Sequence, residues 1–319
     1  MLPIKKAVIE VCGSCNYSCK FCPQSLEMGG RESPFKRMMN FDLFCNTLDQ
    51  LKDSEVEEIY LEGSGEPTMN KRLADYVQAG TDRGFRMCFI TNGFWFKDDL
   101  MKRVVDAGLH FARISVTGYN PELYHKWMSK DAFYEVMDNA NAAIEYGGAG
   151  KIGSYHLILD NNQAEFESQE YQNNWINHVP GIKSSIWKMH NWSGVYDEIN
   201  WRKKPEKRSC GRPFSPDLIV RAGGNDGKQG AVVPCCMVLG QDSKGVLGHL
   251  SDQTIEEVWN GDKYQWLRQM HRDHRFDEID FCKNCDMLYD APEALVWSNF
   301  ETSYDKLTGG AFSMKEFRI

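Results

Sequence analysis

The chain has 319 residues, of which 42% are hydrophobic and 26% are charged, and its formal net charge is −8. This composition is that of a globular protein with a sizeable core, and the negative charge argues against broad electrostatic attraction to nucleic acid or anionic membranes. No stretch approaches the roughly 20 apolar residues of a membrane-spanning helix, and the N-terminus lacks an apolar run of signal-peptide length. We therefore expect a cytoplasmic protein that has neither a nucleic-acid nor a membrane partner.

Strand-like and helix-like segments alternate along the first 200 residues. The expected strands lie within residues 5–11, 57–67, 85–93, 110–118, 154–160 and 183–194. The helices expected between them lie at residues 41–51, 71–84, 98–108, 131–148 and 165–179. Parallel strands need crossover connections, and those connections are right-handed, so repetition of this unit curls the sheet. The pattern predicts an α/β fold with a partial (β/α)6, TIM-like barrel over residues 1–204, in which ligands gather at the C-terminal strand ends.

Beyond about residue 205, glycines and turns become frequent, and one clear helix is expected over residues 254–271. This region has few apolar segments, and a metal bound by its cysteines would supply the missing cross-links. We expect a small second domain over residues 205–290 and a tail over residues 291–319 that packs across the barrel or is loosely ordered. The basic run Trp201–Arg208 is expected to be a solvated linker or to face an anionic ligand.

Eleven cysteines are many for such a chain, and without a secretion signal they indicate metal or redox chemistry. The odd total also excludes a complete set of disulfides. One group, near the N-terminus, consists of Cys15, Cys19 and Cys22. The other, in the last third of the chain, consists of Cys210, Cys235, Cys236, Cys282 and Cys285. The remaining Cys12, Cys45 and Cys88 are expected to be core residues.

The first group has the spacing C-x3-C-x2-C on the loop after the first expected strand. Three thiolates can hold three corners of a [4Fe–4S] cluster, and the fourth iron then lacks a protein ligand and is open to another molecule. Structural zinc would need four ligands, and the nearest further cysteine, Cys12, sits inside the preceding strand. The spacing therefore favours an open iron–sulfur cluster over zinc.

This loop resembles that of the radical S-adenosylmethionine (radical SAM) superfamily, C-x3-C-x-aromatic-C, with Phe21 at the aromatic position. The turn GSGEP, Gly63–Pro67, is similar to the family's glycine–glutamate–proline turn, although alone it would be only a turn. The resemblance covers roughly residues 5–195 and implies that the Glu66 side chain and nearby backbone meet the amino group of SAM. The SAM-binding residues that it implies are Phe21, Ser64, Gly65, Glu66, Pro67, Asn92 and Ser115.

The resemblance also implies a reaction. The open iron would chelate SAM, an electron from the reduced cluster would cleave the C–S bond, and the resulting 5′-deoxyadenosyl radical would abstract hydrogen from a substrate. The cofactor supplies the difficult step, while the barrel positions the reactants and excludes water. Such a protein needs an electron donor such as flavodoxin or ferredoxin, and it is expected to be oxygen-sensitive.

The spacing of the second cysteine group alone leaves zinc and a fully ligated iron–sulfur cluster open. After a radical SAM barrel, the group resembles the "twitch" form of the SPASM extension, and Gly230–Cys235 is similar to that family's G-x4-C element. The resemblance implies one auxiliary [4Fe–4S] cluster, which brings the total to two. Its implied ligands are Cys210, Cys235, Cys282 and Cys285.

Cys236 is left over beside this set. Cys236 has three candidate roles: a spare thiol packed beside the cluster, a cluster ligand in place of Cys235, or a donor of a hydrogen atom to a substrate radical. Five further side chains near the expected strand ends are candidates either for contact with a polar substrate or for plain packing. They are Tyr119, His156, His190, Asn191 and Trp192.

A fully ligated second cluster has no free iron for substrate, so electron transfer is its expected role. Loss of a second electron from a substrate radical gives net oxidation, as is understood for the aminocyclitol dehydrogenase of the butirosin-pathway type, which this layout resembles. The leading hypothesis is oxidation of a secondary alcohol of a sugar or aminocyclitol. The alternatives are epimerisation of a sugar carbon with Cys236 as hydrogen donor, peptide modification by a maturase, and a non-catalytic metal-binding scaffold. A scaffold, however, has no reason to leave an iron open.

Overall fold

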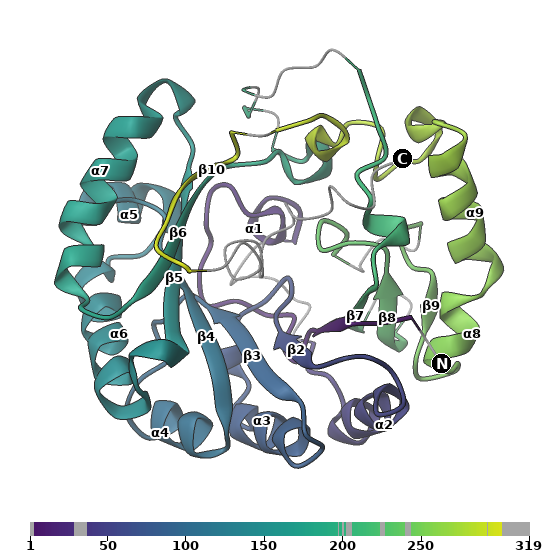
Figure 1. Ribbon diagram of the computed structural model, residues 1–319, viewed down its shortest axis with the longest axis horizontal. Coiled ribbons are helices and arrows are strands. Elements are labelled where there is room, and N and C mark those ends of the chain that lie inside the picture. Colours follow the sequence, from purple (N-terminus) through teal and green to yellow (C-terminus); the bar gives the residue numbers. More distant parts are fainter. Residues whose placement is uncertain are drawn as a thin grey trace.

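The computed structural model of the protein describes residues 3–28, 37–196, 198–199, 201, 206–223, 227–239, 244–291 and 293–301. Over these residues the chain forms one continuous 10-stranded sheet that curls into an incomplete ring, with helices on its outer side (Figure 1). The strand order across the sheet is β10-β6-β5-β4-β3-β2-β1-β7-β8-β9.

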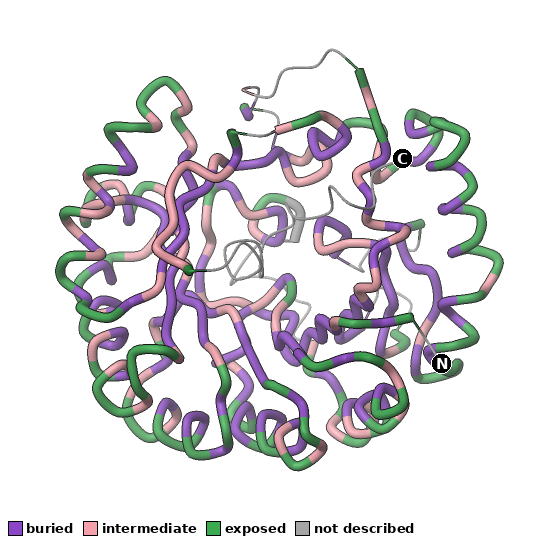
Figure 2. Tube along the Cα trace, viewed as in Figure 1, coloured by how far each residue is buried: buried purple, intermediate pink, exposed green. Residues whose placement is uncertain are grey.

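Six parallel strands make up the barrel part of this sheet, and neighbours in the sheet are neighbours along the chain. They are β1 (Lys6–Ile9), β2 (Glu58–Leu61), β3 (Arg86–Thr91), β4 (Leu109–Ser115), β5 (Ile152–Ile158) and β6 (Lys183–Lys188). The strands are largely buried, as expected of parallel strands that are covered on both faces (Figure 2). The partial (β/α)6 barrel predicted from the sequence is confirmed.

The outer layer consists of amphipathic helices whose inner faces are buried and whose outer faces are exposed (Figure 2). The predicted ones are α2 (Phe41–Leu51), α3 (Leu73–Thr81), α4 (Asp98–Asp106), α6 (Phe133–Gly147) and α7 (Ala164–Asn174). Asn40 caps α2, because its side chain accepts a hydrogen bond of 3.0 Å from the Leu43 N–H.

Two short helices were not anticipated. α1 (Pro23–Met28) follows the cysteine loop directly, and α5 (Pro121–Met128) precedes α6. The sequence did carry a signal for α5, because Asn120 caps it and Pro121 occupies its first turn. Short 3-10 turns lie at η2 (Pro67–Met69), η3 (Ala149–Lys151), η4 (Asn161–Gln163), η5 (Ile176–His178), η6 (Trp192–Gly194), η7 (Arg212–Phe214), η8 (Phe276–Glu278) and η9 (Asp286–Leu288).

The C-terminal region continues the barrel sheet. β7 (Asp217–Gly223) pairs in parallel with β1, and β8 (Gln229–Val233) and β9 (Gly248–His249) follow as antiparallel strands. The domain boundary expected between residues 204 and 205 lies within residues 202–205, which are outside the described residues. These four residues also belong to the basic run Trp201–Arg208. The division into two domains therefore stays a prediction.

The prediction of a single helix over residues 254–271 is wrong. The structure has two helices there, α8 (Ile255–Trp259) and α9 (Asp262–Arg272), beside β9 (Figure 1). Gly261 has an extended backbone, with φ −70° and ψ 160°, and precedes α9 as its cap residue. Apolar residues on both sides of this break are buried, so the apolar pattern did not reveal it.

The expected C-terminal tail begins inside the sheet. β10 (Leu295–Ser298) pairs antiparallel with β6, with Ser298 opposite Ser185, and forms the edge of the sheet (Figure 1). Residues 302–319 of the expected tail lie outside the described residues.

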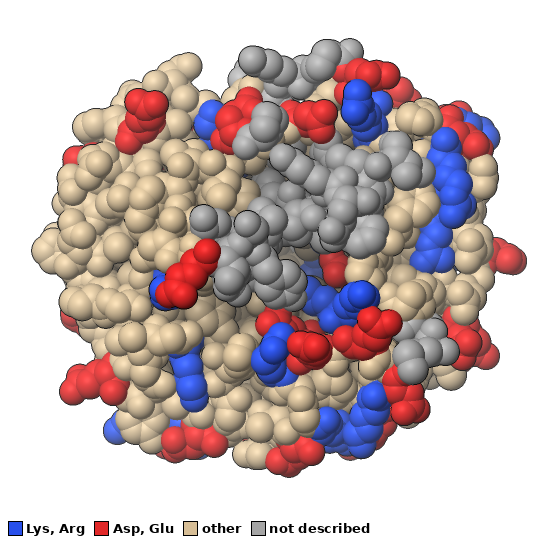
Figure 3. Space-filling model, in the orientation of Figure 1, with Lys and Arg blue, Asp and Glu red and all other residues tan. Residues whose placement is uncertain are grey.

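Charged side chains of both signs lie next to one another around the face of the molecule in Figure 3. Exposed ion pairs of the protein include Lys244 with Asp280 and Arg103 with Asp99. Within the described ranges, no helix is long and apolar enough to cross a membrane.

Candidate active site

A cavity of about 220 Å³ lies at the C-terminal ends of the barrel strands. The cysteine loop after β1 and the turn after β2 border it on one side, and the loop after β8 borders it on another. Its further walls come from residues at or just beyond the ends of β3, β4, β5 and β6. Ligand sites are expected at this edge of a parallel sheet.

The three predicted cluster ligands of the first group, Cys15, Cys19 and Cys22, all border this cavity and form no disulfide. Burial raises the pKa of each thiol, and the neighbouring thiols raise the pKa of Cys19 further. The loop is braced by hydrogen bonds from the Cys22 N–H to the Cys19 carbonyl, at 3.1 Å, and from the Tyr17 N–H to Cys15 Sγ, at 3.4 Å. Three free thiols on one loop fit an iron–sulfur cluster that leaves one iron without a protein ligand.

Cys12 stands apart from this group. It is 2% exposed, forms a β-bridge with Met38 and does not border the cavity. Burial raises the pKa of its thiol to about 12. This is the environment of a buried residue, as the sequence predicted.

The turn after β2 packs against the cysteine loop, a role that the sequence reasoning missed. A Cβ on Gly65 would come within 2.3 Å of the Cys12 carbonyl oxygen and 2.4 Å of the Ser14 carbonyl oxygen. The next residue, Glu66, donates its N–H to the same Ser14 carbonyl at 2.7 Å. Only glycine allows the turn to lie this close to the loop.

The Glu66 carboxylate is 3% exposed and links the ends of β2 and β3. Its Oε1 accepts hydrogen bonds from the Thr68 N–H and hydroxyl and from the Thr91 hydroxyl, and its Oε2 accepts one of 2.7 Å from the Asn92 N–H. Burial raises the pKa of Glu66, and these donors oppose the shift. Oε2 accepts one hydrogen bond from the described residues, whereas Oε1 accepts three, so Oε2 is the oxygen with room for a further donor such as a ligand amine.

The predicted SAM-binding residues mostly border the cavity. Those that do are Phe21, Ser64, Gly65, Glu66, Asn92 and Ser115. Pro67 does not border it, because it is buried as the first residue of η2. The Asn92 amide donates to Asn16 Oδ1 at 2.7 Å, and the Ser115 hydroxyl donates to the Tyr155 hydroxyl at 3.0 Å. Their role in SAM binding stays a prediction.

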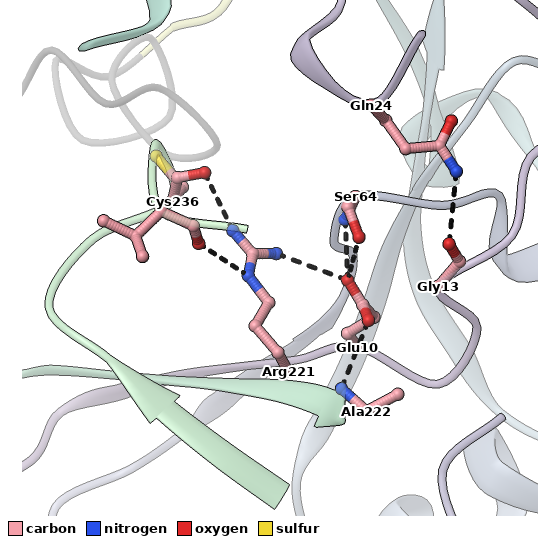
Figure 4. A network of polar contacts seen from close by, with 8 residues as sticks. Glu10, Gly13, Gln24, Ser64, Arg221, Ala222 and Cys236 are labelled. Carbon is pink, nitrogen blue, oxygen red and sulfur yellow. Dashed lines mark hydrogen bonds and ion pairs between the residues drawn. The ribbon is translucent and has the colours of Figure 1, made fainter. Parts of the chain in front are cut away.

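A buried network joins the barrel to the loop that carries Cys236 (Figure 4). Glu10, 0% exposed at the end of β1, accepts hydrogen bonds from the Ser64 N–H at 2.7 Å, the Ser64 hydroxyl at 2.6 Å and the Ala222 N–H at 3.2 Å. Arg221 lies 3.8 Å from the Glu10 carboxylate and donates to the carbonyls of Cys236, at 2.8 Å, and Val238, at 3.1 Å. The position of Cys236 therefore depends on residues of β1, β2 and β7.

The second group of cysteines also comes together. Cys210, Cys235 and Cys285 pack in one cluster with Met237 and Phe276. Burial raises the pKa of Cys282, and the nearby thiols of Cys210, Cys235 and Cys285 raise it further. None of these thiols forms a disulfide. Four neighbouring thiols outside any disulfide fit a fully ligated iron–sulfur cluster.

Neither group converges on a single point. Within the described ranges, no three His, Cys, Asp or Glu side chains are close enough together to hold one metal ion. The thiolates of a [4Fe–4S] cluster bind separate irons, so they do not need to meet at one point.

His271 lies against the second group, which sequence reasoning missed. It is 0% exposed, and burial lowers its pKa to about 4, so the ring is neutral. Its Nδ1 lies 3.0 Å from Ser209 Oγ, and its Nε2 lies 3.7 Å from Cys282 Sγ. With Ser209 as the donor to Nδ1, the Nε2–H is directed at the sulfur. His271 thus connects Ser209, the neighbour of the expected ligand Cys210, with the expected ligand Cys282.

Several further cavity residues were missed. Arg113 and Thr117 border the cavity together with Ser115, and the alternation of these polar residues in and just after β4 was a readable signal. Glu62, the residue after β2, borders it as well.

Of the five candidate substrate residues, His190 and Trp192 border the cavity, whereas Tyr119, His156 and Asn191 do not. His156 is fully buried, and its ring nitrogens lie 2.9 Å from the Val116 carbonyl and 2.9 Å from Glu167 Oε1. It is a structural residue that links β5 to α7.

Comparison with known proteins now adds to this geometry. The model of the radical SAM superfamily matches residues 9–168. The chain belongs to this superfamily. The model of an iron–sulfur cluster-binding domain, SPASM, matches residues 227–286. The predicted cofactors follow from these matches: SAM and a [4Fe–4S] cluster in the first domain, and further iron–sulfur in the second.

The similar proteins differ in activity. The tungsten-containing aldehyde ferredoxin oxidoreductase cofactor-modifying protein of Pyrococcus furiosus is 22% identical, over 89% of this chain and 91% of that protein. The solved structure of BtrN in complex with AdoMet and 2-DOIA is 21% identical, with a TM-score of 0.58 over 89% of this chain and 93% of BtrN. Streptococcus suis SuiB bound to precursor peptide SuiA is 15% identical, with a TM-score of 0.63 over 90% of this chain and 71% of SuiB. At these identities the solved structures show the fold alone.

The contact between Gly65 and the cysteine loop predicts the effect of Gly65→Ala. The new methyl group displaces the loop, so we expect a free energy of unfolding lower by about 1–3 kcal/mol and less iron bound after anaerobic reconstitution. Urea unfolding and iron quantification measure the two effects. Gly150→Ala is the matched control, because no atom lies within 4 Å of its Cβ position. Equal behaviour of the two variants would contradict the assignment.

The network of Figure 4 predicts a large cost for Glu10→Gln. The substitution leaves Arg221 without its buried counter-charge and turns an amide toward N–H donors, so we expect a loss of about 3–5 kcal/mol in the free energy of unfolding. Glu57→Gln, which removes an exposed partner of Arg86, should unfold nearly like the wild type in urea. If both substitutions cost the same, Glu10 is not the counter-charge of Arg221.

Proposed function

We propose that this protein is a radical SAM dehydrogenase that oxidises a secondary alcohol of a sugar or aminocyclitol to a ketone. The observation that carries the proposal is the cavity shared by the two cysteine groups. Cys15, Cys19 and Cys22 border it, and so does Cys236, which follows Cys235 of the second group. A substrate in this cavity would lie between the group that starts the reaction and the group that accepts an electron.

We assign Cys15, Cys19 and Cys22 to the SAM-binding cluster and Cys210, Cys235, Cys282 and Cys285 to one auxiliary cluster. When bound, the first cluster and SAM supply a carbon radical that is strong enough to abstract hydrogen from a C–H bond. The protein's own task is to bind, orient and exclude water. Glu66 would hold the amino group of SAM through Oε2, and the turn that contains Gly65 keeps the cysteine loop in place.

The electrons and protons of the proposed oxidation are all accounted for. Oxidation of a secondary alcohol to a ketone removes two electrons and two protons from the substrate. One hydrogen atom leaves carbon for the radical derived from SAM, one proton leaves the hydroxyl group for solvent, and one electron leaves the substrate radical for the auxiliary cluster. The electron that starts each cycle would come from a flavodoxin or ferredoxin.

The comparisons support a small polar substrate. BtrN, which shares the fold over 93% of its length, was solved with AdoMet and 2-DOIA bound. SuiB, with its bound precursor peptide, favours peptide modification as the alternative.

Epimerisation of a sugar carbon is the second candidate, and the position of Cys236 favours it. This residue borders the cavity, and its carbonyl is fixed by Arg221 at 2.8 Å. A thiol at the cavity wall can return a hydrogen atom to a substrate radical, which would give inversion of the carbon in place of oxidation.

Variants of the two cysteine groups test the proposal that the first group binds the SAM cluster and the second group binds the auxiliary cluster. Cys15→Ala should release no 5′-deoxyadenosine when reduced with dithionite and given SAM, because it lacks a ligand of the SAM-binding cluster. Cys282→Ala should still release it, because it alters only the other cluster. Cys45→Ala changes a half-buried cysteine outside both groups and should match the wild type. The assignment fails if Cys15→Ala cleaves SAM normally, or if the wild type with full clusters releases none.

Cys236→Ala distinguishes oxidation from epimerisation. For a dehydrogenase, the variant should still form the oxidised product, and the product should carry no solvent hydrogen at the reacting carbon. Mass spectrometry of products formed in D2O measures this. If the wild-type product contains solvent deuterium and Cys236→Ala cleaves SAM but loses the incorporation, epimerisation replaces the oxidation proposal.

A further inference from the structure

Arg113 is a buried cation at the wall of the cavity. It lies on β4, borders the cavity and is 3% exposed. Its described contacts are the ring faces of Phe111 and Phe300, whose centroids lie 5.7 Å and 5.6 Å from its guanidinium carbon. Its buried Nε has no hydrogen-bond partner among the described residues. Burying an unpaired charge costs free energy, so such a residue is expected where a ligand completes its contacts.

Glu62 presents the opposite charge at the same cavity. It follows β2, and its buried Oε2 has no hydrogen-bond partner in the described part of the chain. Burial raises the pKa of Glu62, while Lys6, Arg221 and Arg113 oppose the shift. The carboxylate is thus within electrostatic range of the Arg113 guanidinium, but the structure shows no ion pair between these two described residues.

Arg221 is an internal comparison for Arg113. It borders the same cavity and is 2% exposed, yet its guanidinium donates to the Val238 and Cys236 carbonyls and faces Glu10. Arg221 therefore has the contacts of a structural arginine. Arg113, equally buried, lacks them within the described ranges.

Two neutral groups add to this wall. Thr117 is 1% exposed, and neither its Oγ1 nor the indole N–H of Trp192 has a partner among the described residues. Both residues border the cavity, as does the aromatic side chain of Trp187. This wall of the cavity thus combines donors, the Glu62 carboxylate and aromatic surface, the usual composition of a site for a small polar molecule.

We infer that Arg113 and Glu62 recognise the substrate of this cavity, and that the substrate is an uncharged polyhydroxylated ring. One hydroxyl accepts a hydrogen bond from Arg113, and another donates one to Glu62. An anionic substrate would satisfy Arg113 but repel Glu62, and a cationic substrate would do the reverse. A ring with several hydroxyl groups satisfies both, and this inference rests on the proposed function because it names the substrate class of the same site.

The test is a binding measurement on the anaerobically reconstituted full chain in the presence of SAM. Calorimetric titration with myo-inositol and glucose supplies the polyhydroxylated probes, and cyclohexanol and triglycine serve as comparison compounds. The wild type should bind at least one polyhydroxylated probe more tightly than cyclohexanol. Arg113→Gln and Glu62→Gln should each weaken that binding about tenfold or more, because each removes a charged hydrogen-bonding partner. Arg86→Gln changes an arginine outside the cavity and should leave it unchanged.

Thermal unfolding without ligands provides a readout that separates recognition from a structural role. Arg113→Met removes an unpaired buried cation and should leave the melting temperature unchanged or raise it. Arg221→Met removes a fully bonded arginine and should lower the melting temperature. A comparable fall in both variants overturns the inference, because it shows that Arg113 is structural.

Three further outcomes would overturn the inference. The first is that neither polyhydroxylated probe binds the wild type, and the second is that triglycine binds more tightly than both. The third is that Arg113→Gln weakens SAM binding as much as probe binding, which would assign Arg113 to the SAM site. All three leave SAM cleavage by the wild type intact, whereas failure of the proposed function appears as absence of 5′-deoxyadenosine.

Discussion

The arrangement of the site depends on the contacts that the buried carboxylate of Glu10 makes. This carboxylate holds the Ser64 turn after β2, the backbone of β7 and, through Arg221, the loop with Cys236 (Figure 4). The Ser64 turn in turn carries Gly65, which lies against the cysteine loop. One carboxylate thus sets the position of both cysteine groups around the cavity. Because Glu10 is 0% exposed, water cannot replace these contacts, and they hold their geometry.

The continuous sheet extends the effect of the Glu10 contacts to the C-terminal region. β7 pairs with β1 along the whole of β1, from Lys6 opposite Asp217 to Ile9 opposite Val220, so the C-terminal region is fixed to the first barrel strand. The cysteine loop leaves that same strand. The distance between the two cysteine groups is therefore set by hydrogen-bonded strands, as the proposed electron transfer requires.

Local patterns predicted much of the fold and the grouping of the cysteines. The alternating strands and helices depend on residues close in sequence, and the structure has them where they were expected. Gly261 divides a continuous apolar pattern into two helices, and β10 pairs with a strand more than a hundred residues earlier in the chain. Neither feature follows from local periodicity.

The polar cavity residues escaped prediction for a related reason. Arg113 is noticeable in the sequence only as a charged residue in a strand, and its lack of a partner appears when the surrounding strands are in place. The same is true of His271 beside Cys282, which lie eleven residues apart on different elements. Glu66 was expected only as a ligand residue, yet its hydrogen bonds to Thr68, Thr91 and Asn92 also make it part of the framework.

The central claim is that one cavity lies between two different iron–sulfur clusters, of which only the first binds SAM. Electron paramagnetic resonance of the reduced, anaerobically reconstituted protein tests it most directly. We expect two cluster signals, and added SAM should change the one that is lost in Cys15→Ala while the one lost in Cys282→Ala keeps its shape. A single signal, or two signals that SAM leaves unchanged, would contradict the account.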